Sequence, residues 1–163
     1  MAELSGDLLT KLIVRRRTSA SLWPDVADAV RRTMRANKGK NTKPELALRS
    51  LLHRAGYRFR IHGRDLPGTP DLVFTARRKV VFVHGCFWHA HPGCRYATVP
   101  KMRADYWIPK LERTRERDAK HAIRLREMGW VDAVVWECEL KNSMSVLERL
   151  SAFLGPARHS SLG

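Results

Sequence analysis

The chain has 163 residues, 44% of them hydrophobic, which predicts one packed domain and excludes a disordered chain. Lys and Arg number 31 against 16 Asp and Glu, so the formal net charge is +15. A charge of this size attracts a polyanion, and nucleic acid is the commonest one; an anionic membrane surface is the alternative. The sequence has no long apolar run and no apolar signal core, so we expect a soluble, cytoplasmic protein associated with the nucleoid and not with a membrane.

Residues 1–25 are expected to be a basic extension, with Lys11 and Arg15, Arg16 and Arg17 as its charged cluster. A solvated flexible tail is the simpler interpretation, and an arm that lies on DNA is the other. The folded domain is predicted over residues 26–155, followed by a short tail at 156–163. Within it, apolar residues at a spacing of four favour a first helix over residues 26–37.

The next elements follow from capping and periodicity. Thr42 and Glu45 form a capping box, which predicts a helix that begins after Thr42 and stops near Gly56. Alternating or β-branched runs predict strands at 57–61, 71–75, 79–84 and 131–136, and apolar spacing predicts helices at 110–128 and 145–154. The order helix, three strands, helix, strand, helix indicates an α/β fold with a mixed central sheet flanked by helices.

The first candidate site lies where two predicted strands meet. Asp71 begins one strand and His84 ends its hairpin partner, so both are expected at the same edge. The signal is weak by itself, because a Pro-Asp pair at a strand start is often only a turn. One carboxylate with main-chain oxygens still suits Mg²⁺, which keeps several waters. Asp65 lies in a turn, and we expect it to be structural.

The second candidate site contains every cysteine of the chain. Tetrahedral Zn²⁺ takes four nitrogen or sulfur ligands, and Cys86, Cys94 and Cys138 supply three. The nitrogen would come from His89 or His91, and the residues alone do not choose between them. The odd number of cysteines argues against a disulfide framework. The alternative is a buried Cys138 and two unrelated loop thiols.

Large aromatic side chains lie within and just after this loop. Phe87 and Trp88 are adjacent in a short loop, so both cannot easily point inward. Trp107 follows further along. Rings beside a basic surface can insert between base steps of DNA, whereas the simpler interpretation assigns each ring to the core.

Four segments together resemble the very-short-patch-repair (Vsr) endonucleases. The central one is residues 84–89, His-Gly-Cys-Phe-Trp-His, and the others are Met34-Arg35, residues 66–71 and residues 136–138. The resemblance runs in unbroken order over roughly residues 30 to 140, which makes it more specific than a short motif. It implies a zinc-bearing variant of the restriction-endonuclease core.

The resemblance also implies roles for individual residues. The catalytic Mg²⁺ would be held by Asp71 and the main-chain carbonyl of Val83. The general base would be His89, with His84 and Glu45 supporting the site, although Glu45 as a helix cap needs no catalytic role. The structural Zn²⁺ would be held by Cys86, His91, Cys94 and Cys138. Contacts to DNA would come from Phe87, Trp88, Trp107, Met34 and Arg35.

The implied activity is nicking of one DNA strand next to the thymine of a T:G mismatch. The partner would be mismatched double-stranded DNA, a role for mismatch-repair proteins stays open, and a monomer is expected. The alternatives are a restriction-type nuclease that cuts paired DNA and a zinc DNA-binding module without catalysis. The chain departs from the family pattern at Val83, where threonine is usual, and at Pro92-Gly93, where the loop carries one extra residue.

Overall fold

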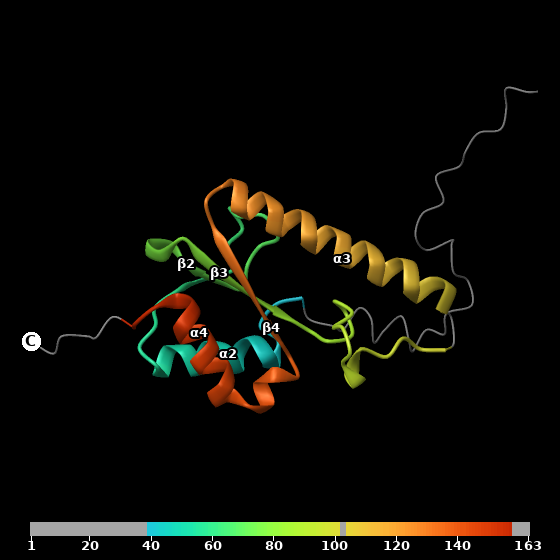
Figure 1. Cartoon of the computed structure of the whole chain (residues 1–163), viewed down its shortest axis with the longest axis horizontal. Helices are drawn as coiled ribbons and strands as arrows, with labels where there is room; N and C mark the ends of the chain where they lie inside the picture. The colour runs from blue at the N-terminus through green and yellow to red at the C-terminus, as the bar shows by residue number, and fades with distance from the viewer. Residues whose placement is uncertain (1–38, 102–103, 158–163) are drawn as a thin grey trace, which may run out of the picture. The chain divides into compact units, whose positions relative to one another are not determined.

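The computed structural model describes residues 39–101 and 104–157 (Figure 1). The extension at 1–25, the helix expected at 26–37, and the DNA contacts expected of Met34 and Arg35 lie outside these ranges, so they remain predictions. The described helices and strands are α2 (Lys43–Arg54), β1 (Arg60–Ile61), β2 (Leu72–Phe74), β3 (Lys79–His84), α3 (Ala104–Glu127), β4 (Val131–Trp136) and α4 (Ser143–Leu154). Their order matches the predicted α/β pattern.

The four strands form one mixed sheet in the order β1-β2-β3-β4. The first two pairings are antiparallel and the pairing of β3 with β4 is parallel. Parallel strands need a crossover connection, and here α3 provides it. The prediction of a mixed sheet with flanking helices is confirmed.

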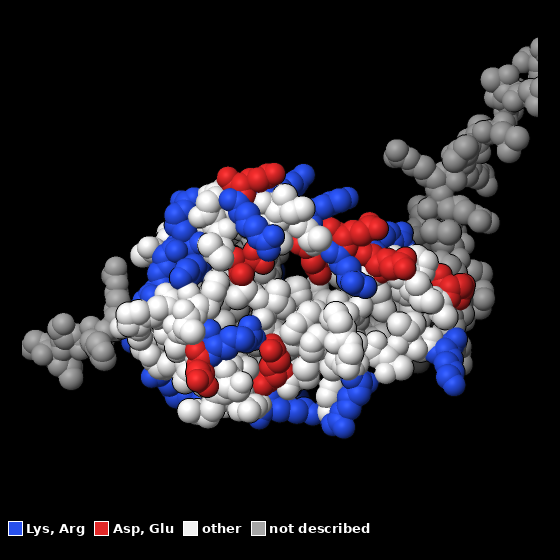
Figure 2. Space-filling model, in the orientation of Figure 1, with Lys and Arg blue, Asp and Glu red and all other residues white. Residues whose placement is uncertain are grey.

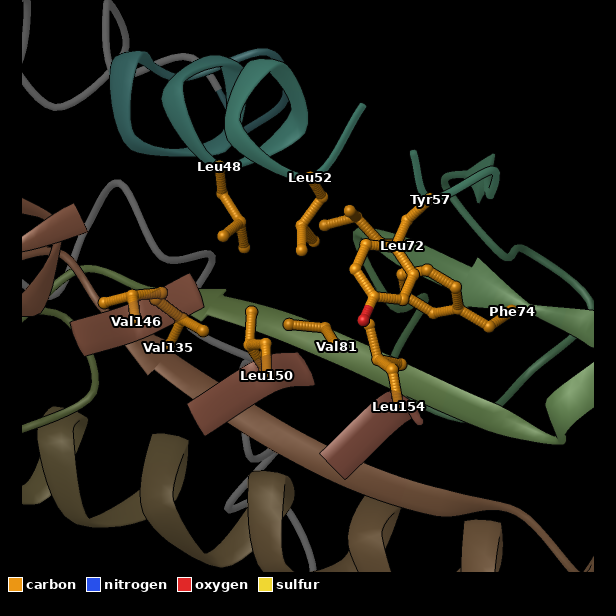
Figure 3. Close-up of a cluster of buried hydrophobic side chains, with 10 residues drawn as sticks. All are labelled: Leu48, Leu52, Tyr57, Leu72, Phe74, Val81, Val135, Val146, Leu150 and Leu154. Atoms are coloured by element: carbon orange, nitrogen blue, oxygen red, sulfur yellow. The ribbon is translucent and has the colours of Figure 1, made fainter. Parts of the chain in front are cut away.

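Successive strand residues point to opposite faces of the sheet, and both faces carry apolar side chains. Helices cover each face and bury them. On one face α2 and α4 pack against β2, β3 and β4, as Figure 3 shows, through the buried residues Leu48, Leu52, Tyr57, Leu72, Phe74, Val81, Val135, Val146, Leu150 and Leu154. On the other face α3 adds Leu125 to Leu66, Val73, Val80 and Trp130. The sheet is therefore the middle of three layers. Because helices cover both of its faces, a functional site would lie at the strand ends.

Three predicted boundaries were wrong. The first strand was expected from residue 57, but only Arg60–Ile61 pairs. The Tyr57 ring is buried instead, and its hydroxyl donates to the Gly155 carbonyl at 2.8 Å. A side-chain contact thus takes the place of the expected strand ladder.

The two later helices begin earlier than expected. α3 was expected from residue 110, but it starts at Ala104 and includes Pro109. Proline removes only one N–H, and this cost is offset by packing of the first turns, where Trp107 contacts Phe87. α4 starts at Ser143, because the Asn142 side chain caps the helix by accepting from the Ser145 N–H at 3.2 Å.

None of the helices within the described ranges is long and apolar enough to cross a membrane.

Candidate active site and metal centre

The N-terminus of α2 brings a buried carboxylate to the edge of the sheet. Glu45 is only 4% exposed. Its Oε1 accepts from the Thr42 hydroxyl at 2.9 Å, and its Oε2 accepts from the Asn41 main-chain N–H at 2.9 Å and from Arg49 Nη2 at 2.8 Å. The capping arrangement expected from the sequence is present. The cap also places Glu45 beside Asp71, so Glu45 both caps α2 and borders the candidate site.

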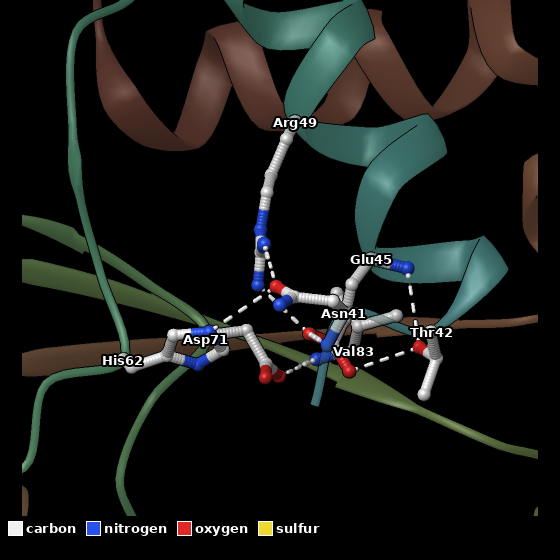
Figure 4. A network of polar contacts seen from close by, with 7 residues as sticks. All are labelled: Asn41, Thr42, Glu45, Arg49, His62, Asp71 and Val83. Atoms are coloured by element: carbon white, nitrogen blue, oxygen red, sulfur yellow. Dashed lines mark hydrogen bonds and ion pairs between the residues drawn. The ribbon is translucent and has the colours of Figure 1, made fainter. Parts of the chain in front are cut away.

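Asp71 stands at the start of β2 and faces the end of β3. Its Oδ2 accepts from the Val83 main-chain N–H at 2.7 Å, which fixes the carboxylate against the strand where the sequence placed it (Figure 4). Burial raises the pKa of Asp71 from its usual 3.8 to about 6, although the Val83 hydrogen bond works in the other direction. A partly buried carboxylate with an elevated pKa gains from a cation that replaces the missing water.

Two residues that the sequence did not single out as site residues complete this edge. His62 lies with Glu45 and Asp71 in a group whose potential ligand atoms are all within 4.8 Å of one another. Arg49 pairs with Glu45 and also donates from Nη1 to Asn41 Oδ1 at 2.7 Å. Figure 4 shows these side chains converging from α2, the segment after β1, and β2. The result is a mixed group of carboxylates, an imidazole and a guanidinium.

A second group holds the two histidines of the 84–89 motif. The rings of His84 and His89 stack with centroids 3.7 Å apart and planes 8° from parallel. His89 Nδ1 lies 2.6 Å from Asp118 Oδ2 on α3. In parallel stacked rings the nitrogen lone pairs lie in parallel planes and do not converge, so this group suits proton transfer better than metal binding, although its ligand atoms are close.

The charges in this group are set by burial and by contact. Burial, with the neighbouring His89, lowers the pKa of His84 from 6.5 to about 4, so the ring is neutral at pH 7. Burial works to raise the pKa of Asp118, but the hydrogen bond to His89 and nearby positive charge outweigh it and lower the pKa below its usual value. Because an ionised Asp118 only accepts, the neutral form of the His89 ring carries its proton on Nδ1 and has its lone pair on Nε2.

The third group contains the three cysteines and one histidine. Potential ligand atoms of Cys86, His91, Cys94 and Cys138 all lie within 4.8 Å of one another, and Cys138 Sγ is 3.4 Å from His91 Nδ1. His89, the other histidine considered for this role, turns instead toward Asp118. The donor set of three sulfurs and one nitrogen fits a tetrahedral Zn²⁺ site.

Main-chain geometry closes the loop around this group. The His91 N–H donates to the Cys86 carbonyl at 2.9 Å, and the Cys94 N–H donates to the His91 carbonyl at 3.3 Å. Gly93 has φ of 68°, a conformation that favours glycine, so the Pro92-Gly93 turn is a place that can accommodate an additional residue. Burial raises the pKa of the Cys86 thiol to about 12. A cation would have to displace that proton, so its binding must depend on pH.

The aromatic residues form one cluster beside the cysteine loop. Phe87 lies 5.1 Å from both Trp88 and Trp107, centroid to centroid, in edge-on contacts. Trp88 is 38% exposed, whereas Phe87 is half-buried. Lys110 Nζ lies over the rings of Trp88 and Trp107 at 5.7 and 5.2 Å. The rings are thus packed on one another and still reach the surface.

Two residues of these groups, Asp118 and His62, could not be identified from the sequence, for a common reason. Asp118 is one of five acids on a charged helix, with no local feature that distinguishes it from Glu116. His62 follows a strand too short to predict well. Asp118 contacts His89 across 29 residues of chain, and His62 contacts Asn41 across 21. Only an expected pairing of α3 with the cysteine loop would have identified Asp118.

Comparison with known proteins gives consistent relatives. A family model described as DNA mismatch endonuclease Vsr matches residues 24–95. The type II nicking enzyme V.XorIIP of Xanthomonas oryzae pv. oryzae is 55% identical over 124 residues, which cover 76% of this chain and 90% of that protein. The DNA mismatch endonuclease Vsr of Escherichia coli K12 is 43% identical over 119 residues, or 72% of this chain and 76% of that one. The type II nicking enzyme V.NaeI of Lentzea aerocolonigenes is 41% identical over 141 residues, with 82% and 84% covered.

Proposed function

This chain belongs to the DNA mismatch endonuclease Vsr family, and we propose that it nicks one strand of duplex DNA next to the thymine of a T:G mismatch by magnesium-dependent hydrolysis. Family membership makes it an endonuclease, so a non-catalytic zinc module no longer fits. The observation that carries the proposal is the arrangement at the end of β3. The Val83 N–H holds the Asp71 carboxylate, and the next residue, His84, stacks on His89, which pairs with Asp118.

In this proposal Asp71 and the main-chain carbonyl of Val83 hold the Mg²⁺. The Asp71 carboxylate is fixed by the Val83 N–H, so it is oriented before the cation arrives. When bound, the Mg²⁺ supplies positive charge at the scissile phosphate and at the leaving oxygen.

The proton transfer falls to His89. Its Nε2 accepts the proton of the attacking water, and Asp118 stabilises the positive charge that then forms on the ring. His84 stacks against His89 and stays neutral, so it orients the base without repelling the charge that develops there.

The preference for a mismatch would come from the aromatic cluster. A Zn²⁺ at Cys86, His91, Cys94 and Cys138 would hold the loop that carries Phe87 and Trp88. Inserting rings between base steps costs a few kcal/mol per step, and the cost is least where pairing is already weak. The name of the E. coli relative, a DNA mismatch endonuclease, supports action on a mismatch, and the choice of T:G rests on the family resemblance alone.

The test uses end-labelled duplexes of one sequence that carry T:G, C:G, A:C or T:C at one position. We expect a single-strand nick beside the thymine of T:G, with Mg²⁺ and not with chelator. Trp88→Ala should lower this preference more than it lowers binding to matched DNA. Equal cutting of matched and mismatched duplex would refute the proposal and favour a restriction-type nuclease.

A further inference from the structure

His62 stands at the proposed cation site in an unusual backbone conformation. Its φ is 52°, in the left-handed region that residues other than glycine seldom adopt. The segment is held there because the His62 N–H donates to the Asp71 carbonyl at 3.3 Å and the Gly63 N–H donates to the Pro70 carbonyl at 3.0 Å. Such conformations cluster at functional sites, so the conformation of His62 suggests a role for its imidazole ring.

The ring is directed into the group of carboxylates. A nitrogen of His62 lies within 4.8 Å of a carboxylate oxygen of both Glu45 and Asp71, and Figure 4 shows the ring beside Asp71. Glu45 already accepts three hydrogen bonds, from Asn41, Thr42 and Arg49. A carboxylate offers about four lone-pair sites, so Glu45 has little left for a cation. Of the three side chains in this group, Asp71 and His62 are therefore the ones available to bind a cation.

A hydrogen-bond chain prepares the ring as a ligand. His62 Nε2 lies 3.3 Å from Asn41 Oδ1, and the same oxygen accepts from Arg49 Nη1 at 2.7 Å. A guanidinium only donates, so this atom is an acceptor, and Nε2 must carry the proton. Nδ1 is left with its lone pair. Histidines that ligate metals characteristically donate their other N–H to an oxygen in this way.

We propose that His62 is a further protein ligand of the catalytic cation, and that it makes this site favour Mn²⁺ over Mg²⁺. The inference rests on the proposed function of Asp71. Mg²⁺ prefers oxygen ligands and keeps its waters, whereas an imidazole suits transition metals, whose affinity for nitrogen is greater. Adding one nitrogen to an Asp71 and carbonyl site therefore shifts its selectivity.

The experiment compares zinc-loaded wild type with His62→Gly, because glycine accepts the φ of 52° and removes only the ring. The exposed His53, on α2, provides a matched control as His53→Ala. Binding of Mn²⁺ is followed by the loss of the free-ion paramagnetic resonance signal, and nicking of a T:G duplex is titrated with Mn²⁺ and with Mg²⁺. Melting temperature and zinc content establish that each variant is folded.

We expect His62→Gly to bind Mn²⁺ at least about tenfold more weakly, the scale for losing a residue at a metal site. The ratio of the half-saturating Mg²⁺ and Mn²⁺ concentrations in nicking should fall accordingly, while His53→Ala matches wild type. Equal Mn²⁺ binding by wild type and His62→Gly would overturn the inference, even if wild type nicks DNA. If Mn²⁺ binding depends on His62 and Asp71 but no duplex is nicked with either metal, the proposed function fails and the ligand assignment stands.

Discussion

The Asp71 carboxylate is placed where ionisation is unfavourable, since burial raises its pKa to about 6 and a single main-chain N–H partly compensates. Asp65 shows the contrast within the same chain. It is exposed, and its hydrogen bond with Arg60 lowers its pKa. The surroundings of the two carboxylates differ, although their roles as a site residue and a structural residue remain predictions from the sequence. In the proposed function, a cation bound at Asp71 would offset the cost of ionising this carboxylate.

We predict that Asp71→Asn stabilises the magnesium-free protein above pH 6. The folded pKa lies above the usual 3.8, so the cost of ionisation is absent below about pH 4 and complete above about pH 6. Two pKa units correspond to at most about 3 kcal/mol, or several degrees of melting temperature. Melting curves of wild type and variant from pH 4 to 8, with zinc retained, measure the difference.

Asp65→Asn is the control for this prediction. Its lowered pKa reverses the sign, so that variant should gain nothing above pH 4. An Asp71→Asn protein that melts below wild type at pH 7.5 would show that the carboxylate is stabilised in the folded state, contrary to its burial.

We predict that Asp118→Asn slows nicking by roughly a hundredfold, the scale for losing correct general-base catalysis. An asparagine in place of the carboxylate removes the charge that stabilises protonated His89, and its amide can favour the wrong ring tautomer. Single-turnover rates at saturating enzyme measure the loss. Glu116→Gln, exposed on the same helix, is the matched variant and should retain its rate. A rate unchanged in Asp118→Asn would remove this residue from the mechanism.

Local sequence signals located most of the helices and strands, whereas features that depend on contacts between distant residues could not be predicted. The capping box at Thr42 and Glu45 located α2, and β-branched runs located β3 and β4. The start of α3 was missed, because proline is disfavoured inside a helix, and the contact of Trp107 with Phe87 that packs its first turns joins residues far apart in the chain. The cysteine loop was identified as irregular, but which histidine faces the sulfurs depends on how the loop folds onto α3 and Trp136.

The two loop histidines should separate cleanly in metal content. His91 stacks on Trp136 with centroids 4.0 Å apart and lies against Cys138, whereas His89 is bound to Asp118. We predict that His91→Ala loses zinc and melts several degrees lower, because the loop loses a ligand that ties it to β4. His89→Ala should keep its zinc and lose nicking. Metal analysis of protein purified without added zinc decides, and the opposite pattern would mean that the two roles are exchanged.

The charge of the whole molecule is unevenly distributed. The helix α3 carries seven basic and five acidic residues, and Figure 2 shows both signs mixed over the face that contains it. Of the net +15, residues 1–25 contribute only +1, from four basic and three acidic residues, so residues 26–163 carry +14. The long-range attraction to DNA therefore resides mostly in the rest of the chain, even though the extension contains a run of three arginines.

We predict that deleting residues 1–25 weakens DNA binding at low salt without changing which duplex is preferred. Each phosphate contact adds about 0.9 to the slope of log affinity against log salt. The extension holds four basic residues, Lys11, Arg15, Arg16 and Arg17, so the slope should fall by no more than about four. Affinities from about 50 to 200 mM salt for T:G and C:G duplexes measure both quantities.

An arm that lies on DNA and a solvated tail differ in this measurement. An arm that places all four cations on phosphates gives the full fall in slope, while a tail in solution contributes only through the net +1 and gives a small one. A full-length variant with Arg15→Ser, Arg16→Ser and Arg17→Ser removes three charges and keeps the length of the extension. If this variant matches wild type and the deletion does not, the extension acts by its chain and not by its charge. Loss of nicking at saturating enzyme would place residues 1–25 in the catalytic domain, and the predicted boundary at residue 26 would be wrong.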